Sequence, residues 1–259
     1  MERVFMLVLE YDGTRFCGWQ SQPDGRSVQQ AVEGAMSRLA GTPRKATAAG
    51  RTDAGVHAHA MPVTIAMPDR WSCADLQRAA NALLPIDIAV RAVYPVQDSA
   101  NARRSALGRR YRYTVATTVQ ARSPFRNRLA WALGRTLDLA AMQRCADLLP
   151  GLHDFRAFAA VGEPKPHYRC QVTEARWNHD GDGCAYFTIA ADRFLHHMVR
   201  MLVGTMVDIG LGRRPEGDMA RLIHLEHNGD TSPPAPAAGL AFVSAGYPAE
   251  LVTGDGVSW

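Results

Sequence analysis

The chain has 259 residues, which is long enough for one large domain or two smaller ones with a sizeable core. Its composition, 47% hydrophobic and 21% charged, is that of an ordinary globular protein and excludes a disordered, collagenous or fibrous chain. The 29 Lys and Arg exceed the 25 Asp and Glu, and the resulting net charge of +4 does not by itself select a partner.

The first half of the chain predicts the element order β-α-β-β-α-β. A buried strand is expected over residues 3–10, followed by a turn at Tyr-Asp-Gly. Ser27 and Gln30 fit a capping box for a helix that ends near Gly41. The further predicted elements are strands at 45–49 and 58–67, a helix at 73–83 and a strand at 87–95.

The second half predicts a similar set of elements. In chain order these are a strand at 109–118, a helix at 138–149, strands at 168–177 and 184–190, a long helix from 192 to about 210, a short helix after Pro215 and a strand at 239–246. The Pro- and Ala-rich loop at 231–238 is expected to be mobile.

Two similar halves predict an α/β (α+β) protein whose strands form a mixed, mainly antiparallel sheet with helices. The pattern is compatible with one large sheet and with two sheets that face a shared cleft. The expected division is an N-terminal half of residues 1–103 and a C-terminal half of residues 104–259.

No apolar stretch is long enough to span a bilayer, and the short apolar run near the N-terminus lacks the length and cleavage site of a secretory signal. The five cysteines are scattered and form no Cys-x-x-Cys pair, so neither a disulfide framework nor a zinc knuckle is indicated. We therefore expect a cytoplasmic protein with reduced thiols and no membrane segment.

The densest special segment is Gly-Arg-Thr-Asp-Ala-Gly-Val-His-Ala at residues 50–58, between two predicted strands. Its two glycines allow unusual backbone angles and the close approach of a ligand, and Arg51 and Asp53 carry opposite charges. One interpretation is a functional loop. The other is a tight turn in which Asp53 caps a backbone N–H, and spacing alone favours this second interpretation.

Residues 101–128 form a strongly basic stretch with eight arginines and no acidic residue. As a strand, residues 109–113 would place Tyr111 and Tyr113 on one face and Arg110 and Arg112 on the other. Such interleaving suits RNA, because guanidinium groups bind phosphates while rings stack on exposed bases. The alternative is an edge strand that keeps the protein soluble, but a solubilising surface normally mixes both charge signs, so we favour nucleic acid.

The predicted helix at 192–210 carries Arg200 in an otherwise apolar sequence. A buried guanidinium without an anionic partner is costly, so an acidic residue or a ligand from elsewhere is expected to meet it. The alternative is that Arg200 extends to the edge of the helix. His196 and Gly204 are expected one turn to either side, where Gly204 leaves room for a close neighbour.

Metal and cofactor sites are not indicated. On a helix, adjacent His196 and His197 would point in different directions, and His57 and His59 have no Cys or carboxylate at ligand spacing, so structural roles are favoured. The sequence also lacks the glycine-rich signatures of dinucleotide and P-loop binding and the serine elbow of hydrolases.

Along nearly its whole length the chain resembles the tRNA pseudouridine synthase A (TruA) family. The block Gly-Arg-Thr-Asp-Ala-Gly-Val-His at 50–57 is highly specific, and the other matches are individually weak and jointly strong. These others are Tyr-Asp-Gly at 11–13, Gly-Trp-Gln at 18–20, Ser-Val-Gln at 27–29, Asn-Ala-Arg at 101–103, the segments 109–113 and 194–200, and Gly-Leu at 239–240.

The resemblance implies the pseudouridine synthase fold with a basic cleft. It also implies isomerisation of uridine to pseudouridine in tRNA, typically at positions 38 to 40 of the anticodon stem-loop, by a homodimer without a cofactor. By analogy Asp53 is the catalytic aspartate, Tyr111 contacts the target base and Arg200 pairs with Asp53. Arg51 would help to hold the displaced nucleotide and Leu240 would pack in the pocket. The expected contacts to the rest of the tRNA are Arg103, Arg109 and Arg112.

One departure from the family is Arg104, which stands where the family usually has an aromatic residue. Without that ring, stacking of the RNA strand at this position is expected to differ. A non-catalytic RNA-binding protein is one alternative, with Asp53 as a turn residue. An aspartate-nucleophile hydrolase is another, but it would need a second carboxylate within a motif of its own, which the sequence lacks. Only the isomerase gives roles to Asp53, Tyr111 and Arg200 together.

Overall fold

The computed structural model describes residues 1–161, 167–181 and 183–252, and the chain divides into two compact units. Unit 1 contains Met1–Arg109 and the segment from Ala241 onward, and unit 2 contains Arg110–Leu240. The C-terminal segment belongs to unit 1 because the last strand, β10 (Leu240–Gly246), pairs in parallel with a strand of that unit. Within the described ranges, no helix has the length and apolarity that a bilayer crossing requires.

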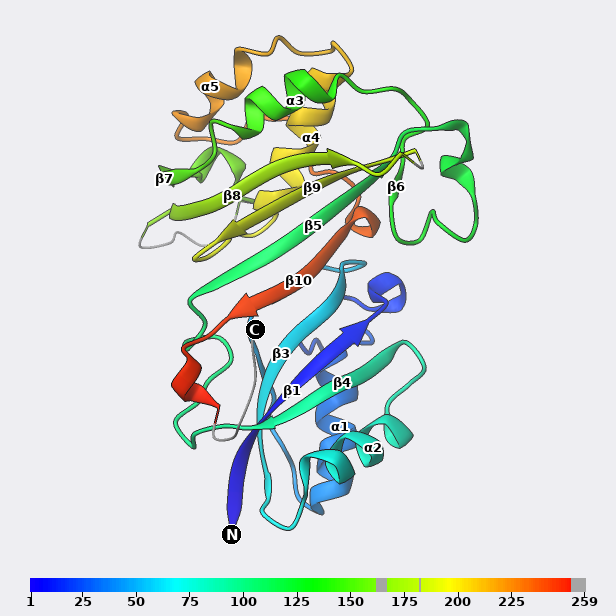
Figure 1. Cartoon of the computed structure of the whole chain (residues 1–259), viewed down its shortest axis with the longest axis vertical. Helices are drawn as coiled ribbons and strands as arrows, with labels where there is room; N and C mark the ends of the chain where they lie inside the picture. Colours follow the sequence, from blue (N-terminus) through cyan, green and yellow to red (C-terminus); the bar gives the residue numbers. More distant parts are fainter. Residues whose placement is uncertain (162–166, 182, 253–259) are drawn as a thin grey trace. The chain divides into compact units, whose positions relative to one another are not determined.

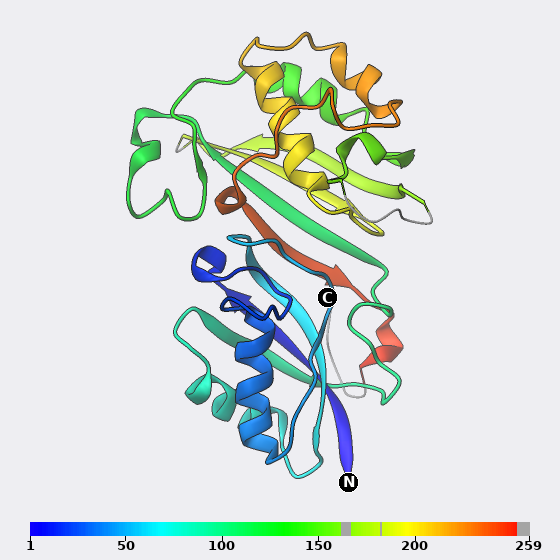
Figure 2. The same ribbon diagram turned by 180° about the vertical axis from the view of Figure 1, so that it is seen from behind.

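Unit 1 is a β-sheet with two helices on one face (Figures 1 and 2). Besides β10, its elements are β1 (Glu2–Tyr11), α1 (Val28–Ala40), β2 (Thr47–Ala48), β3 (His57–Pro68), α2 (Cys73–Leu83) and β4 (Ile88–Pro95). Strand β1 lies between antiparallel β3 and β4, and β2 pairs with β3. The predicted order β-α-β-β-α-β is confirmed for this unit.

The apolar run of β1 explains its central place in the sheet. Phe5, Met6 and Leu7 are all fully buried, and because successive strand residues point to opposite faces, both faces of β1 are covered. The capping box predicted for α1 is present, since the Ser27 hydroxyl accepts from the Gln30 N–H and the Gln30 side chain accepts from the Ser27 N–H. The helix buries Val28, Val32, Ala35 and Met36 and ends at exposed Gly41.

Unit 2 is a second sheet packed against helices. Its elements are β5 (Gly108–Ala116), β6 (Trp131–Ala132), α3 (Leu139–Ala146), β7 (Gly151–Asp154), β8 (Arg169–His179), β9 (Cys184–Ala191), α4 (Met198–Gly210) and α5 (Asp218–Ile223). The strand order is β5-β9-β8-β7, with β6 parallel to β5. The Trp177 ring of β8 lies 5.1 Å from the Phe187 ring of β9, and its indole N–H donates to the sulfur of Met206 on α4. The sheet and α4 therefore share one core.

The predicted α/β class with a mixed, mainly antiparallel sheet is confirmed. Strands β6 and β7 were not predicted, because two and four residues are too few to show a strand pattern. Short 3-10 helices lie at Gly13–Arg15, Val119–Arg122, Arg156–Phe158, Ala237–Gly239 and Ala249–Leu251.

Helix α4 is shorter than predicted: it begins at Met198 and not at residue 192. His197, immediately before it, has a φ of 63°, and residues 192–197 are irregular. A left-handed residue cannot continue a right-handed helix, so the apolar spacing before His197 reflects burial and not helix. His196 is therefore not on the helix that carries Arg200, and the prediction that the two adjacent imidazoles diverge was wrong, since their ring centroids lie 4.0 Å apart.

Candidate active site

The loop that carries Asp53 connects β2 to β3 in unit 1, and we call residues 49–56 the Asp53 loop. The segment that follows β1 holds its backbone. The Trp19 N–H donates to the Thr52 carbonyl at 3.0 Å, and the Gly55 N–H donates to the Phe16 carbonyl at 3.2 Å. The loop is thus fixed by main-chain hydrogen bonds on both sides of Asp53.

The side chains of the Asp53 loop alternate between inside and outside. Thr52 is 7% exposed and its hydroxyl lies 2.9 Å from the Tyr11 hydroxyl, whereas Arg51 is exposed and Asp53 partly exposed. A tight turn closes where the Val56 N–H donates to the Asp53 carbonyl at 3.2 Å. This turn contact engages the backbone of Asp53 and not its carboxylate.

Two glycines of the preceding segment permit this arrangement. A Cβ on Gly13 would lie 2.0 Å from the Val56 carbonyl oxygen, and one on Gly18 would lie 2.6 Å from the Thr52 carbonyl oxygen. Gly18 also has a φ of 102°, a conformation that other residues rarely adopt. The Tyr-Asp-Gly and Gly-Trp-Gln segments therefore form the support of the Asp53 loop.

His57 has a structural contact, as the sequence favoured. Its imidazole is 4% exposed, and Nδ1 accepts from the Gly13 N–H at 3.1 Å. The same Nδ1 lies 3.3 Å from a carboxylate oxygen of Asp12, whose side chain also accepts from the Thr14 N–H. His57 thus links the start of β3 to the turn after β1.

The Asn-Ala-Arg segment forms a turn that directs two arginines into solvent. The Asn101 side-chain oxygen accepts from the N–H groups of Arg103 and Arg104 at 3.1 and 3.0 Å. Both arginines are exposed. Arg109 differs, because its guanidinium donates to the carbonyls of Ala49, Ala106 and Arg103. Arg109 therefore ties the Asp53 loop to the turn that carries Arg103.

Strand β5 has the alternation that the sequence predicted, with Tyr111 and Tyr113 buried and Arg110 and Arg112 exposed. Arg110 pairs with Glu174 at 2.8 Å, and the Arg112 guanidinium lies 5.9 Å from the centre of the Tyr186 ring. The Tyr111 ring meets the Phe194 ring edge-on, with 5.0 Å between centroids. The residues just before α4 therefore help to orient Tyr111.

Arg200 lies in the first turn of α4 and is held by the Pro- and Ala-rich segment. Its Nε donates to the Ala235 carbonyl at 2.7 Å, and the Ala235 N–H donates to the Arg200 carbonyl at 2.9 Å. One turn further on, a Cβ at Gly204 would lie 2.3 Å from the Pro233 carbonyl oxygen. The close neighbour predicted at Gly204 is confirmed as this segment.

We call residues 228–239 the strap. The sequence favoured a mobile loop here, but hydrogen bonds tie the strap to α4 and to β5. The Tyr113 hydroxyl donates to the Pro236 carbonyl at 2.7 Å, and burial raises the pKa of this phenol, so it remains a donor. Gly239 lies against the Tyr113 ring, where a Cβ would come within 2.5 Å of it. Leu240 follows directly and is buried.

The predicted site residues fall into two groups. Arg51, Asp53, Arg103 and Arg109 belong to unit 1, and Tyr111, Arg112, Arg200 and Leu240 belong to unit 2. Sequence reasoning missed the hydroxyl contact of Tyr113 and the part played by strap carbonyls. A backbone carbonyl carries no residue signature, so only the prolines marked this segment.

Comparisons with known proteins show which family the chain resembles over nearly its whole length. The family model described as tRNA pseudouridine synthase matches residues 7–103 and 145–248, which include the Asp53 loop, α4 and the strap. The chain is also similar to curated proteins named tRNA pseudouridine synthase A. One from Syntrophotalea carbinolica is 39% identical over 97% of this chain and 99% of that protein. Others from Moorella thermoacetica and Porphyromonas gingivalis are each 38% identical, over 93% and 95% of this chain and 98% of each protein.

Proposed function

The chain belongs to the tRNA pseudouridine synthase family and isomerises uridine to pseudouridine in tRNA, and we propose that Asp53 is its catalytic carboxylate. The observation that carries the proposal is the Asp53 loop. Close contacts at Gly13 and Gly18 and main-chain hydrogen bonds fix its backbone. Arg51 and Asp53 flank the inward-pointing Thr52. Such a loop presents a carboxylate at a defined place.

The chemistry accounts for the residue type. The bond between N1 of uracil and C1′ of ribose breaks, and a bond between C5 and C1′ forms. The proton on C5 leaves and N1 gains one, so the product is an isomer without redox change or hydrolysis. A carboxylate acts either as the nucleophile at C1′ or as the base that removes the C2′ proton. Both routes require Asp53 in its ionised form.

Arg200 is the proposed partner of Asp53. A guanidinium beside a carboxylate stabilises its negative charge. The guanidinium has five N–H donors, and the contact with the Ala235 carbonyl uses one of them and orients the group. The pairing also supplies the anionic partner that Arg200 in an apolar helix needs.

The remaining groups hold the RNA. Tyr111, oriented by Phe194, contacts the target uracil, Leu240 packs against it and exposed Arg51 holds the displaced nucleotide. Extruding the uridine costs a few kcal/mol, which phosphate contacts offset. Exposed Arg103 and Arg112 provide such contacts, and Arg109 supports them by fixing the Arg103 turn to the Asp53 loop.

The proposed targets are positions 38 to 40 of the anticodon stem-loop, and the proposed acting form is a homodimer in the cytoplasm, where tRNA is found. The resemblance over nearly the whole chain supports these assignments. Arg104 is exposed beside Arg103, so this departure from the family adds a positive charge at the surface without changing the core. Mapping pseudouridine in tRNA from cells without the gene tests the target positions.

Replacing Asp53 with Asn tests the catalytic assignment. The side chain keeps its shape but loses its charge, and we expect pseudouridine formation to fall by about a thousandfold or more. The affinity for tRNA should stay within about threefold of the parent. Asp24→Asn, at an exposed position of the same unit, is the matched control and should leave the rate unchanged. Activity of Asp53→Asn within tenfold of the parent would end the proposal.

A further inference from the structure

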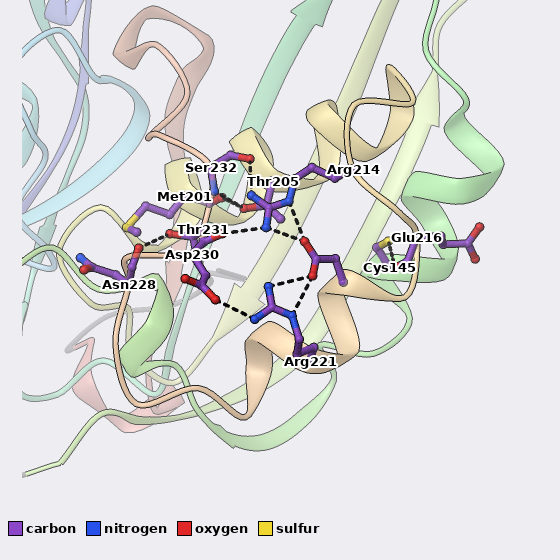
Figure 3. A network of polar contacts seen from close by, with 11 residues as sticks. Cys145, Met201, Thr205, Arg214, Glu216, Arg221, Asn228, Asp230, Thr231 and Ser232 are labelled. Carbon is purple, nitrogen blue, oxygen red and sulfur yellow. Dashed lines mark hydrogen bonds and ion pairs between the residues drawn. The ribbon is translucent and has the colours of Figure 1, made fainter.

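A cluster of ion pairs holds the beginning of the strap (Figure 3). Arg214 Nε donates to one oxygen of Asp218 at 2.9 Å, and Arg221 Nε donates to the other at 2.9 Å. Arg221 Nη1 also donates to the Asp230 carboxylate at 2.7 Å. We call these four residues the clamp. One carboxylate thus joins two arginines, and the second arginine reaches into the strap.

The clamp also binds the strap through Arg214. Its Nη2 donates to the Asp230 carbonyl at 2.6 Å, and its Nη1 donates to the Ser232 hydroxyl at 3.3 Å. The Ser232 N–H in turn donates to the Thr205 hydroxyl of α4 at 3.3 Å, and Ser232 is 3% exposed. Arg214 therefore fixes the strap where it meets the helix that carries Arg200.

Half of the clamp is shielded from solvent, whereas the side chains of Arg221 and Asp230 are 49% and 44% exposed. The side chains of Arg214 and Asp218 are 20% and 12% exposed. Burial opposes ionisation of Asp218, but the hydrogen bonds from Arg214 and Arg221 outweigh it and lower the pKa of this carboxyl. Arg144 and Glu216 form a comparable two-bond pair in the same unit, but their side chains are 57% and 43% exposed. These bonds join the two side chains to each other and not to the strap, so the pair is a natural control.

The strap between Ser232 and Pro236 is short and stiff. It contains Pro233, Pro234 and Pro236, and each proline ring fixes its own φ near about −65°. Ala235, only three residues after Ser232, exchanges two hydrogen bonds with Arg200. A displacement at Ser232 is therefore passed on to the Ala235 carbonyl and is not absorbed by flexible backbone.

We infer that Arg214 is a positioning residue for the isomerisation: by fixing the strap, it holds the Ala235 carbonyl where it orients the guanidinium of Arg200. The inference rests on the proposed role of Arg200 beside Asp53. Arg214 itself touches neither the RNA nor the reacting atoms. Its effect is on the rate of the chemical step, because a misoriented cation supports the carboxylate less well.

The test compares Arg214→Gln with Arg144→Gln in the full chain. For Arg214→Gln, kcat with tRNA should fall about 10- to 100-fold while KM stays within about twofold, since misplacement by about 1 Å costs about a hundredfold. Hydrogen exchange at the Ser232 and Ala235 amides should speed up. Arg144→Gln should change none of these. A parental kcat, or a rise in KM with kcat unchanged, would overturn the inference.

A double-variant cycle separates positioning from a general loss of structure. Arg200→Lys keeps a cation but removes the Nε–H that the strap orients. If Arg214 acts through this contact, adding Arg214→Gln to Arg200→Lys should lower kcat by less than about twofold. The same fold loss in both backgrounds would refute the inference.

Where Arg214→Gln does not fold, Ser232→Ala supplies the milder variant, because it removes only the hydroxyl that Arg214 binds. A fall in kcat of about threefold or more with unchanged KM supports the inference, and a parental kcat refutes it. A different result would overturn the proposed function, namely parental activity of Asp53→Asn. If Asp53→Asn is inactive and Arg214→Gln has parental activity, only the role of Arg214 is refuted.

Discussion

The Asp53 loop and the strap are both irregular segments that position a proposed catalytic group, but they are held in different ways. Main-chain hydrogen bonds join the Asp53 loop to the segment after β1. The two backbones can approach this closely because Gly13 and Gly18 have no side chains. In the strap, Arg214, in the turn before α5, binds the Asp230 carbonyl, and Arg221 of α5 binds the Asp230 carboxylate. The first arrangement tolerates no added atom, whereas the second depends on charge.

This difference predicts how each segment fails. A carbon atom placed between two backbones cannot be accommodated by a rotamer change, so the loop must move as a whole. Removing a hydrogen bond to a charged group costs about 1.5 to 3 kcal/mol, and no added atom then forces two backbones apart. Disturbing the Asp53 loop should therefore affect activity more than disturbing the clamp.

Among variants that disturb the support of these two segments, the largest effect is expected for Gly18→Ala. The new Cβ would lie 2.6 Å from the Thr52 carbonyl oxygen, at a residue whose φ of 102° already excludes most side chains. We expect displacement of Asp53 and a fall in kcat of about a hundredfold, measured by tritium release or by pseudouridine mapping.

Gly34→Ala in helix α1 is the matched control. A Cβ at Gly34 would meet nothing within 4 Å, so kcat should be unchanged. The free energy of unfolding should rise by about 0.5 to 1 kcal/mol, because alanine favours the helix. Equal kcat values for the two variants would show that the glycine contacts do not place Asp53.

Acid should weaken the clamp and not the glycine contacts. Burial opposes ionisation of Asp218, but the hydrogen bonds from Arg214 and Arg221 outweigh it and lower its folded-state pKa. A carboxyl with a lowered folded-state pKa contributes stability above its unfolded pKa of about 3.9, and this stability is lost as the pH falls through the folded-state pKa.

Urea unfolding between pH 7 and pH 3 checks this prediction. The parent should be more stable than Asp218→Asn above about pH 5, and the difference should shrink as the pH falls below about 4. A difference in unfolding free energy that stays constant down to pH 3 would mean that the charge of Asp218 does not contribute.

The smallest effect concerns RNA binding. Arg51→Ala or Arg103→Ala should reduce the slope of log K against log salt by about 0.7 to 0.9 for each phosphate that the variant no longer neutralises. Arg214→Gln should leave the slope unchanged, because its guanidinium is occupied by Asp218, Asp230 and Ser232. Filter binding of tRNA over a salt series measures this. A parental slope for both arginine variants would remove them from the interface.

The sequence predicted the parts of the fold that depend on neighbouring residues. The capping box of α1 and the alternation along β5 were correct because both patterns are set within a few residues. The start of α4 was not, since the left-handed conformation of His197 has no residue signature there. The RNA contact predicted for Arg109 stays a prediction, whereas the bonds of its guanidinium to the Ala49 and Ala106 carbonyls were not predicted, because folding brings these groups together.

By itself the sequence determined the family and the reaction type, and it predicted Asp53, Tyr111 and Arg200 as site residues, because a specific block of eight residues and a charge in an apolar segment are visible in the order of residues alone. Only the tertiary structure decided how these groups are held. The support for Asp53 comes from glycines in the segment after the first strand, and the orientation of Arg200 comes from a carbonyl 35 residues later. Contacts of backbone atoms across such separations arise from folding, and no spacing of residue types encodes them.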